Sequence, residues 1–241
     1  MIIDSSNFSF HCPPQIARAK RVLIKPDAAY SRPHPVTTRR EVLGRIISGI
    51  RKVSDADIIL LESSSDGQPM SDIYRSLSYN FTRVLMLDVD NCSYLEVENP
   101  LLHPFAIPTF WIPNIILSCD YLITVSCFKV VGGNGHFSIM NLMGLLPQVK
   151  YSTPFTKDKN VLHNFEIQRL AADLHFTLPF DLGIIDAQYT MTSENDPGQG
   201  TEEEAGKIII GAPYQVDCEA SEMAGVDTEY LRLIETGQAD L

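Results

Sequence analysis

The segment Asp120-Tyr-Leu-Ile-Thr-Val-Ser126 decides the fold that this sequence predicts. It is apolar, contains β-branched residues and is too short for a helix, which is typical of a buried strand. A loop with three glycines and one cation follows, Cys127-Phe-Lys-Val-Val-Gly-Gly-Asn-Gly135, and residues 136–146 then show an apolar pattern that predicts a helix ending at Pro147. In open α/β sheets, loops that leave the strand ends in this way build the ligand crevice.

Further short apolar segments predict more strands of the same sheet. They are Arg21–Lys25, Asp57–Glu62, Arg83–Asp88, Leu182–Asp186 and Lys207–Gly211. Between the first two, apolar residues recur at helical spacing after Thr38-Arg-Arg-Glu41, which has the spacing of a capping box. A strand, a helix and a strand at this separation predict a parallel, right-handed βαβ unit. We therefore expect an α/β fold with a mostly parallel central sheet and helices on both faces.

The length of 241 residues allows one large domain or two small ones, and we expect a single α/β domain over residues 1–241. A chain of this size buries roughly 70–75% of its unfolded surface, so the core needs neither disulfides nor metals. Residues 161–176 predict a helix. Residues 187–206 are long, polar and rich in turn residues, which predicts a lid or an irregular segment.

Composition excludes several classes of partner. The formal net charge of -11 disfavours nucleic acid and anionic membrane surfaces, because both need clustered Lys and Arg. Residues 1–14 lack the pattern of a signal peptide, and prolines and polar residues interrupt the most hydrophobic segment, residues 111–128, so no membrane span is expected.

The five cysteines are widely spaced and contain no Cys-x-x-Cys pair. This pattern favours reduced thiols in a cytoplasmic protein, and no local spacing fits an iron–sulfur cluster.

Ionisable residues stand at the carboxyl ends of the predicted strands: Lys25, Glu62, Asp88, Lys129 and Asp186. If the strands are parallel, these side chains converge on one crevice, which is the default site for a ligand. The alternative is that buried strands commonly have polar ends. We expect the crevice to bind a small anionic molecule such as a carboxylate or a phosphate.

The candidate residues divide into two groups. Lys129, Asp186 and Asp217 are the candidate catalytic residues. Candidate ligand-binding residues are Lys25, Glu62, Asn134, His136 and Asn141. Backbone amides of the glycine-rich loop before the predicted helix could hold an anion, although a flexible turn explains the same residues. His136 titrates near neutrality and could transfer protons, or it could simply cap or pack the helix.

No metal ligand set is predicted from histidine, because no His-x-x-x-His or Glu-x-x-His spacing occurs. Mg²⁺ or Ca²⁺ held by Glu62, Asp186 and Asp217 is an alternative that the sequence leaves open. The cofactor is otherwise unspecified.

Several short motifs together resemble the domain of unknown function 362 family. Val22-Leu-Ile-Lys-Pro-Asp27 with Val36-Thr-Thr-Arg-Arg-Glu-Val42 is similar to its opening, and residues 120–129 are similar to its central strand ending in lysine. Asn141-Leu-Met-Gly144 is similar to a later segment. The resemblance continues through Asp186, Gly198, Gly200, Val216-Asp217 and Ala224-Gly225. It implies an α/β fold with a cleft and supplies no substrate.

The chain departs from that family pattern in four ways. Asp27 stands where the family has Asn, and Met140 where it has Lys. Val130 and Val131 occupy the place of a histidine, and the ferredoxin-like cysteine segment of many members is absent. These departures keep a second function open, a non-catalytic accessory or redox-partner module, beside the site for a small anion.

Overall fold

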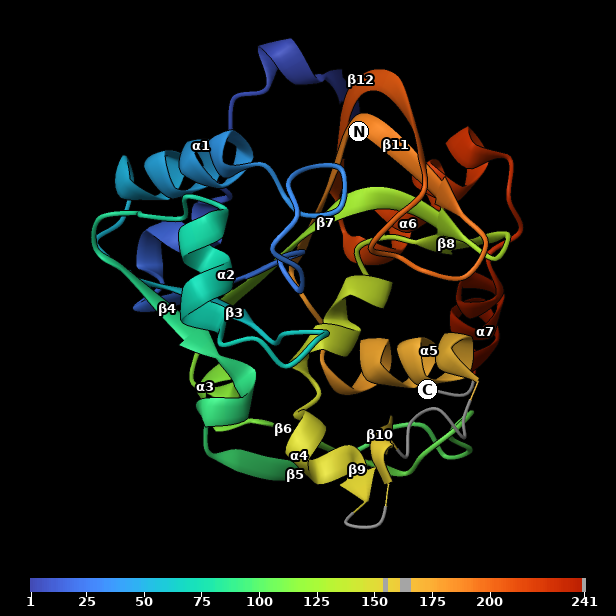
Figure 1. Cartoon of the computed structure of the whole chain (residues 1–241). Coiled ribbons are helices and arrows are strands. Elements are labelled where there is room, and N and C mark those ends of the chain that lie inside the picture. Colours follow the sequence, from blue (N-terminus) through green and yellow to red (C-terminus); the bar gives the residue numbers. More distant parts are fainter. Residues whose placement is uncertain (154–155, 161–165, 240–241) are drawn as a thin grey trace.

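The computed structural model describes residues 1–153, 156–160 and 166–239 and is built around an eight-stranded sheet (Figure 1). Its strands are β1 (Ile2–Asp4), β2 (Arg21–Pro26), β3 (Asp57–Glu62), β4 (Val84–Asp88), β7 (Tyr121–Val131), β8 (Asn134–His136), β11 (Leu182–Ser193) and β12 (Thr201–Gly211). They lie in the order β1-β12-β11-β7-β2-β3-β4, and β8 pairs with β7. The strands from β4 to β11 in this order are parallel, whereas β12 and β8 are antiparallel to their neighbours. The predicted α/β fold is confirmed.

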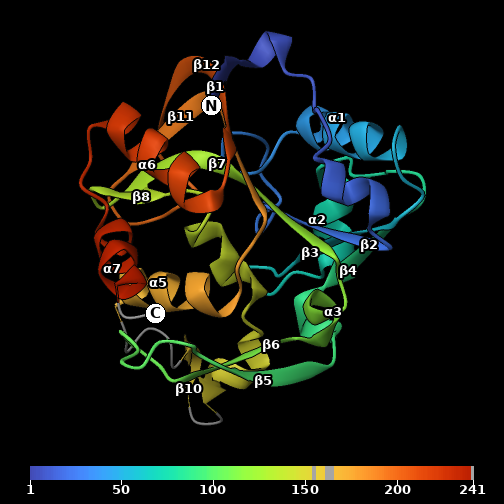
Figure 2. The same ribbon diagram turned by 180° about the vertical axis from the view of Figure 1, so that it is seen from behind.

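Helices cover both faces of the sheet, with α1 and α2 on one side and α5, α6 and α7 on the other (Figures 1 and 2). The α-helices are α1 (Arg40–Arg51), α2 (Met70–Ser76), α3 (Asn114–Leu117), α4 (Gln148–Tyr151), α5 (Ile167–Thr177), α6 (Pro213–Ala224) and α7 (Glu229–Gln238). The described residues also form the 3-10 helices η1 (Ser5–Asn7), η2 (Pro14–Arg18), η3 (Val89–Asn91) and η4 (Met140–Leu145). Two antiparallel pairs, β5 (Tyr94–Glu98) with β6 (Thr109–Pro113) and β9 (Ser152–Thr153) with β10 (Thr156–Asn160), lie outside the sheet.

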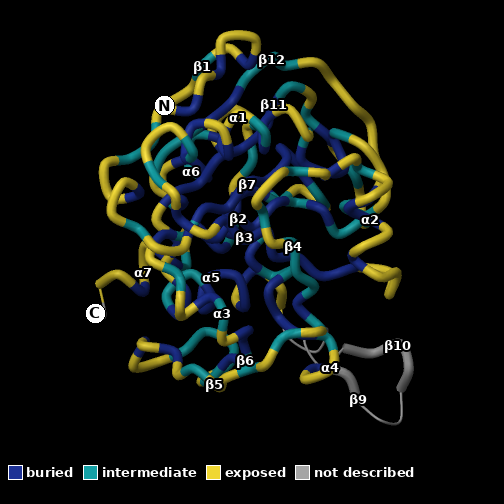
Figure 3. Tube along the Cα trace, turned by 90° about the vertical axis from the view of Figure 1, so that its left-hand side faces the viewer, coloured by how far each residue is buried: buried dark blue, intermediate teal, exposed yellow. Residues whose placement is uncertain are grey.

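Alternate residues of the strands pack into two separate hydrophobic layers, one on each face of the sheet. Val22 and Ile24 of β2 pack with α1 and α2, while Leu23, between them, packs with η4 and α5 on the opposite face. All three side chains are fully buried. Strands buried on both faces read as continuous apolar runs, which is why the sequence pattern identified them. Figure 3 shows the sheet as the most deeply buried part of the trace.

Residues 187–206 correct one prediction, because most of them form strands. β11 continues to Ser193 and β12 begins at Thr201, and the two strands pair along this length as a hairpin. Their outer parts are polar and mostly exposed or half-buried, so composition alone indicated a lid or a loop. Hydrogen bonds across the hairpin satisfy the backbone whether or not the side chains are apolar. Only the turn at residues 194–200 is irregular.

The segment after Ser126 corrects a second prediction. β7 runs on to Val131 and turns back into β8, so the glycine-rich loop is a hairpin turn and no helix begins at His136. Gly132 and Gly133 have φ of 56° and 77°, values that favour glycine. The predicted helix over 136–146 shrinks to the six-residue η4. The predicted anion site at the start of a helix is therefore wrong for this loop.

Two smaller differences concern helix starts. Thr38 does not cap α1: its hydroxyl donates to the Val125 carbonyl and accepts from the Asp27 amide. The helix predicted over 161–176 is α5, which begins at Ile167; residues 161–165 lie outside the described residues. Among the residues that the structure describes, no helix is long and apolar enough to cross a membrane.

Two glycines of α1 give a matched test of how the N-terminal segment packs. A Cβ on Gly49 would lie 2.8 Å from the Phe10 carbonyl oxygen, whereas one on Gly44 would lie 3.8 Å from its nearest neighbour, a carbon of the Phe81 ring. Gly49→Ala should lower the free energy of unfolding by about 1–3 kcal/mol through overpacking. Gly44→Ala should raise it by about 0.5–1 kcal/mol through helix propensity. Urea unfolding of both variants measures these changes in free energy. Equal effects of the two substitutions would contradict the close packing of Phe10 against Gly49.

Candidate functional site

The carboxyl ends of β2, β3 and β7 bring three of the predicted site residues to one edge of the sheet. β2 lies between β3 and β7, parallel to both, with Lys25 opposite Thr124 of β7. Lys25 and Glu62 stand at the ends of β2 and β3, and Lys129 lies on the extension of β7 beyond them. Parallel pairing places these ends on the same side, as expected for an α/β crevice.

Lys25, Glu62 and Asn141 form a buried cluster that links the sheet to η4. The Lys25 ammonium donates to Glu62 Oε2 at 2.7 Å, to Asn141 Oδ1 at 2.8 Å and to the Pro26 carbonyl at 2.9 Å. The side chains of Lys25 and Glu62 are only 2% and 1% exposed. An ammonium has three N–H donors, so the protein itself fills all of them.

Glu62 is equally well satisfied. Beside Lys25, it accepts from the backbone amides of Ala28 and Ser63, both at 2.9 Å. Burial raises the pKa of the Glu62 carboxyl, and Lys25 and the two amides oppose that rise. The cluster also explains Gly144: a Cβ there would lie 2.4 Å from Glu62 Oε1, so only glycine allows η4 to approach this closely.

Lys129 and Asp27 form a second buried ion pair. Lys129 Nζ lies 2.7 Å from Asp27 Oδ2, and the lysine side chain is 4% exposed. Burial lowers the pKa of Lys129, but Asp27 and Cys127 more than compensate and raise the pKa above its usual value, which keeps the ammonium charged. Asp27 is the only partner of this ammonium among the described residues, so two N–H donors remain.

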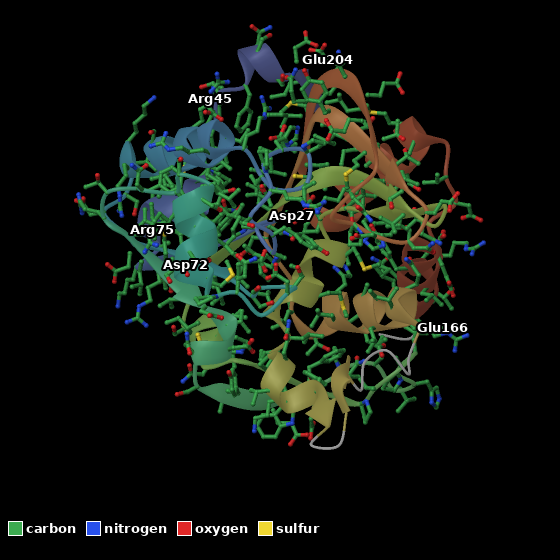
Figure 4. The ribbon with its side chains drawn as sticks, in the orientation of Figure 1. Asp27, Arg45, Asp72, Arg75, Glu166 and Glu204 are labelled. Atoms are coloured by element: carbon green, nitrogen blue, oxygen red, sulfur yellow. The ribbon has the colours of Figure 1, made fainter. Side chains whose placement is uncertain are left out.

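The position of Asp27 is fixed by the backbone around it. Its amide donates to the Val125 carbonyl of β7 at 2.8 Å and to the Thr38 hydroxyl at 2.9 Å, and its carbonyl accepts from the Thr38 amide at 2.7 Å. The Asp that replaces the Asn of the family pattern thus supplies the counter-charge for Lys129. Figure 4 shows Asp27 in the middle of the molecule, in contrast to the peripheral Arg45 and Glu204.

His136 lies directly across the β7–β8 hairpin from Lys129. Residues paired in this way have Cβ atoms about 4.5–5.5 Å apart and point to the same face. Burial, with a smaller contribution from Lys129, lowers the pKa of His136 to about 4, so the ring is neutral at pH 7. No described residue forms a hydrogen bond with the ring.

These groups surround a cavity of about 190 Å³. Five of the eight predicted site residues line it: Lys25, Glu62, Lys129, His136 and Asn141. Its other walls include residues that sequence reasoning missed as part of the site, namely Asp27, Tyr30, Phe137, Met140, Met143, Ile167 and Pro197. Asp27 had a local signal, since it follows Lys25 by two residues. Pro197 had none, because it reaches the rim through the β11–β12 turn.

The remaining three predicted residues do not line this cavity. Asn134 is the first residue of β8, directly after the hairpin turn, and its side-chain amide donates to the Gly132 carbonyl at 3.3 Å. Asp186 is fully buried at the bulge of β11, where Arg39 donates to its two oxygens at 2.7 and 2.6 Å. Its Oδ2 also lies 3.7 Å from Nδ1 of His34.

Asp217 of α6 is the third, and it holds the chain between β8 and η4. Its carboxylate accepts from the amides of Ser138 and Ile139, both at 2.9 Å, from the Ser138 hydroxyl at 2.5 Å and from the Tyr230 hydroxyl at 2.7 Å. Burial raises the pKa of Asp217 to about 6 against these four donors. Asp217 thus fixes two consecutive amides of this segment, while His136 before them is a strand residue that pairs with Lys129, so no helix starts at residue 136.

No group of three or more His, Cys, Asp or Glu side chains within the described part of the chain is placed to hold a metal ion. Glu62, Asp186 and Asp217 each have different protein partners, as given above.

A larger hollow of about 650 Å³ lies elsewhere, between α2 and β4, and is lined among others by Met70, Tyr74, Met86 and Asp88. Its two ionic side chains are Arg75 and Asp88. The strand-end residue Asp88 thus belongs to this hollow and not to the cavity at Lys129. Convergent buried charges, which the larger hollow lacks, mark the smaller cavity as the candidate site.

The fold is similar to that of a solved structure, the lactate racemase apoprotein from Thermoanaerobacterium thermosaccharolyticum. The TM-score is 0.56 at 13% sequence identity, and the match covers 89% of this chain and 52% of the racemase chain. The chain therefore corresponds to about half the length of that protein. No curated protein matches the chain.

The arrangement is that of an α/β protein with a charged cavity at the carboxyl ends of its parallel strands. A family model, Domain of unknown function (DUF362), matches residues 22–222. The chain belongs to this family, as its sequence motifs predicted.

The buried Lys25–Glu62 pair can be tested by removing one or both charges. Lys25→Met leaves Glu62 buried without a counter-charge and should lower the free energy of unfolding by about 3–5 kcal/mol. Lys25→Met with Glu62→Gln should lower it less, because no charge is left unpaired. The exposed pair of Arg75 and Asp72 (Figure 4) is the control. Arg75→Met should change the free energy of unfolding by less than about 1 kcal/mol. Guanidinium denaturation measures all three, and a double variant less stable than Lys25→Met would contradict the account.

Asp217 predicts a pH dependence of stability. The pKa of Asp217 in the folded protein, about 6, lies above the usual 3.8. Its stabilising contribution to the free energy of unfolding is therefore fully present below about pH 4 and is lost as the pH rises through 6. Asp217→Asn should remove this part of the profile and cost about 1–3 kcal/mol, because an amide NH₂ faces an N–H or O–H donor. Asp173→Asn is the control. Asp173 is likewise a buried acceptor of backbone amides, three in its case, but this variant should keep the pH dependence that Asp217 causes. Urea unfolding from pH 4 to 7 decides, and an unchanged slope in Asp217→Asn would contradict the assignment.

Proposed function

We propose that this protein binds a small anionic molecule, a carboxylate by preference, in the cavity at the strand ends, through the ammonium of Lys129. One observation carries the proposal: Lys129 is buried and charged, lines the cavity, and has only Asp27 as a partner among the described residues. A buried ammonium with unused donors is costly unless something fills them. A ligand oxygen would fill them with charge-assisted hydrogen bonds.

The two lysines predicted to hold the anion are thereby distinguished. Lys25 has three protein acceptors and supports the site from behind, as do Glu62 and Asn141. Lys129 has donors to give, and His136 beside it has ring nitrogens without a protein partner in the described chain. The ligand's charged group belongs next to these two residues.

The size and lining of the cavity limit the rest of the ligand. Typical ligand pockets measure about 300–1,000 Å³, so a cavity of about 190 Å³ suits a molecule of only a few heavy atoms. The same cavity is also lined by the apolar side chains of Phe137, Met140, Met143 and Ile167. A short carboxylate with a small apolar body fits both conditions.

The name of the racemase with a similar fold adds lactate to the ligands worth testing. Lactate is a small hydroxycarboxylate and meets the same two conditions. At 13% identity the likeness concerns the fold, so the proposal rests on Lys129 and not on that protein.

Catalysis would use Lys129 as the group that touches the ligand. Asp186 and Asp217, which we predicted as catalytic, would act indirectly. Asp186 holds Arg39 at the bulge of β11, and Asp217 fixes the backbone that carries the cavity residues Phe137 and Met140. A cation such as Mg²⁺ would enter only with the ligand.

A second candidate is a non-catalytic accessory or redox-partner module. It is favoured by the way Lys25, Glu62 and Asn141 satisfy one another, which leaves a small cavity. A ligand screen distinguishes this module from the anion-binding protein, because an accessory module has no ligand that stabilises it through Lys129.

The test is a thermal-shift screen of the intact protein with acetate, pyruvate, D-lactate, L-lactate and malonate, with and without Mg²⁺. At least one carboxylate should raise the melting temperature by an amount that grows with concentration, since it binds only the folded state. Lys129→Met should weaken that ligand at least tenfold, because a hydrogen bond to a charged group contributes about 1.5–3 kcal/mol.

Two further variants make the outcome clear. Lys129→Met with Asp27→Asn leaves no buried charge unpaired, so a folded variant without binding separates the site from stability. Lys207→Met removes a lysine that also pairs with an aspartate, Asp4 at 2.6 Å, but at an exposed position, and should bind normally. If no carboxylate stabilises the wild type, or if Lys129→Met binds as well, the proposal is wrong.

A further inference from the structure

We infer that the cavity takes up its carboxylate together with a proton, which His136 holds beside the ligand. The inference deepens the proposed function and rests on it. It begins with the β7–β8 hairpin, in which Lys129 and His136 are direct cross-strand partners and both line the cavity. A carboxylate on the free donors of Lys129 therefore lies next to the imidazole ring.

The ring is placed to respond to such a ligand. His136 is neutral, because burial and the neighbouring Lys129 lower its pKa to about 4. It has no hydrogen-bond partner in the described part of the chain, so no described residue holds either ring nitrogen in a hydrogen bond. An imidazole that gains a proton becomes a donor on both nitrogens and can bind a ligand oxygen directly.

Within the described residues, two charged groups act on the pKa of His136. Lys129 of β7 opposes its protonation, and Asp27 after β2 favours it. η4, which packs against β8, contains no titratable side chain within Met140–Leu145. α6 also packs against β8.

The titratable groups of α6 have other partners or lie at the surface. Asp217 is bound by Ser138, Ile139 and Tyr230, Glu219 pairs with the amino terminus, and Cys218 and Tyr214 interact with each other. Glu222 is exposed. Tyr30 lines the cavity and stays neutral, since burial raises the pKa of its hydroxyl.

A bound carboxylate changes this balance. An opposite charge within about 4–6 Å shifts a pKa by about 1–3 units toward the charged form. The pKa of His136 therefore rises from about 4 in the free protein to about 5–7 in the complex. Between these values binding takes up a proton, and affinity strengthens as the pH falls from 7 toward 5, by at most about tenfold per pH unit.

The experiment measures proton uptake directly. Isothermal titration calorimetry with pyruvate and with D- and L-lactate is run at pH 5.5 in two buffers of different ionisation enthalpy, and again at pH 7.5. We expect uptake of about 0.2–1 proton at pH 5.5 and a weaker affinity at pH 7.5. His136→Gln and His136→Asn should bind with no uptake and with an affinity that does not change with pH.

His175→Gln is the matched control. Burial lowers the pKa of His175 to about 4 as well, but it lies on α5 and does not line the cavity, so uptake should remain. A histidine NMR titration provides a second readout, in which the His136 pKa should rise by at least one unit when ligand is present.

The outcomes are distinct. Uptake in the wild type and in His175→Gln that is lost in the His136 variants supports the inference. Carboxylate binding without uptake, or with uptake that persists in the His136 variants, overturns it and leaves the proposed function intact. Absence of binding by all three carboxylates, and by acetate and malonate titrated in the same way, overturns both.

Discussion

The ion pair between Lys129 and Asp27 is the interaction on which the site depends. It joins the extension of β7 to the segment that leaves β2, and both partners are largely buried. Without Asp27 the ammonium would lose its charge to burial, because the interior disfavours an isolated cation. With Asp27 it stays charged, and Lys129 lines the cavity with Asp27 as its one partner among the described residues.

The surrounding structure keeps this pair in place. Thr38 binds the backbone on both sides of the site, through Asp27 and Val125, before α1 begins. On the other side, Lys25, Glu62 and Asn141 attach η4 to the sheet, and Asp217 fixes the two amides before it. Most buried charges in this region therefore serve to position backbone, and one ammonium keeps free donors.

The sequence predicted the sheet well because β2, β3 and β7 are apolar on both faces, a pattern that local composition reveals. It also predicted that strand ends such as Lys25, Glu62 and Lys129 would gather, because parallel pairing leaves no other arrangement. The sequence did not predict the β7–β8 and β11–β12 hairpins. The outer parts of β11 and β12 are polar, and their pairing depends on a partner strand that no local pattern identifies.

The helix expected at His136 failed for a similar reason. His136 belongs to β8, and its pairing with Lys129 of β7 is a strand pairing that the apolar pattern after residue 136 does not reveal. The roles of the lysines were equally hidden: each follows an apolar run in the sequence, and only their three-dimensional partners distinguish Lys25 from Lys129.

The most direct measurement of the central idea is NMR of the lysine side-chain nitrogens during a titration with pyruvate. The account predicts that the Nζ resonance of Lys129, assigned through Lys129→Met, shifts and saturates with the ligand, while that of Lys25 changes little. Saturable pyruvate binding that leaves the Lys129 resonance unmoved would contradict it.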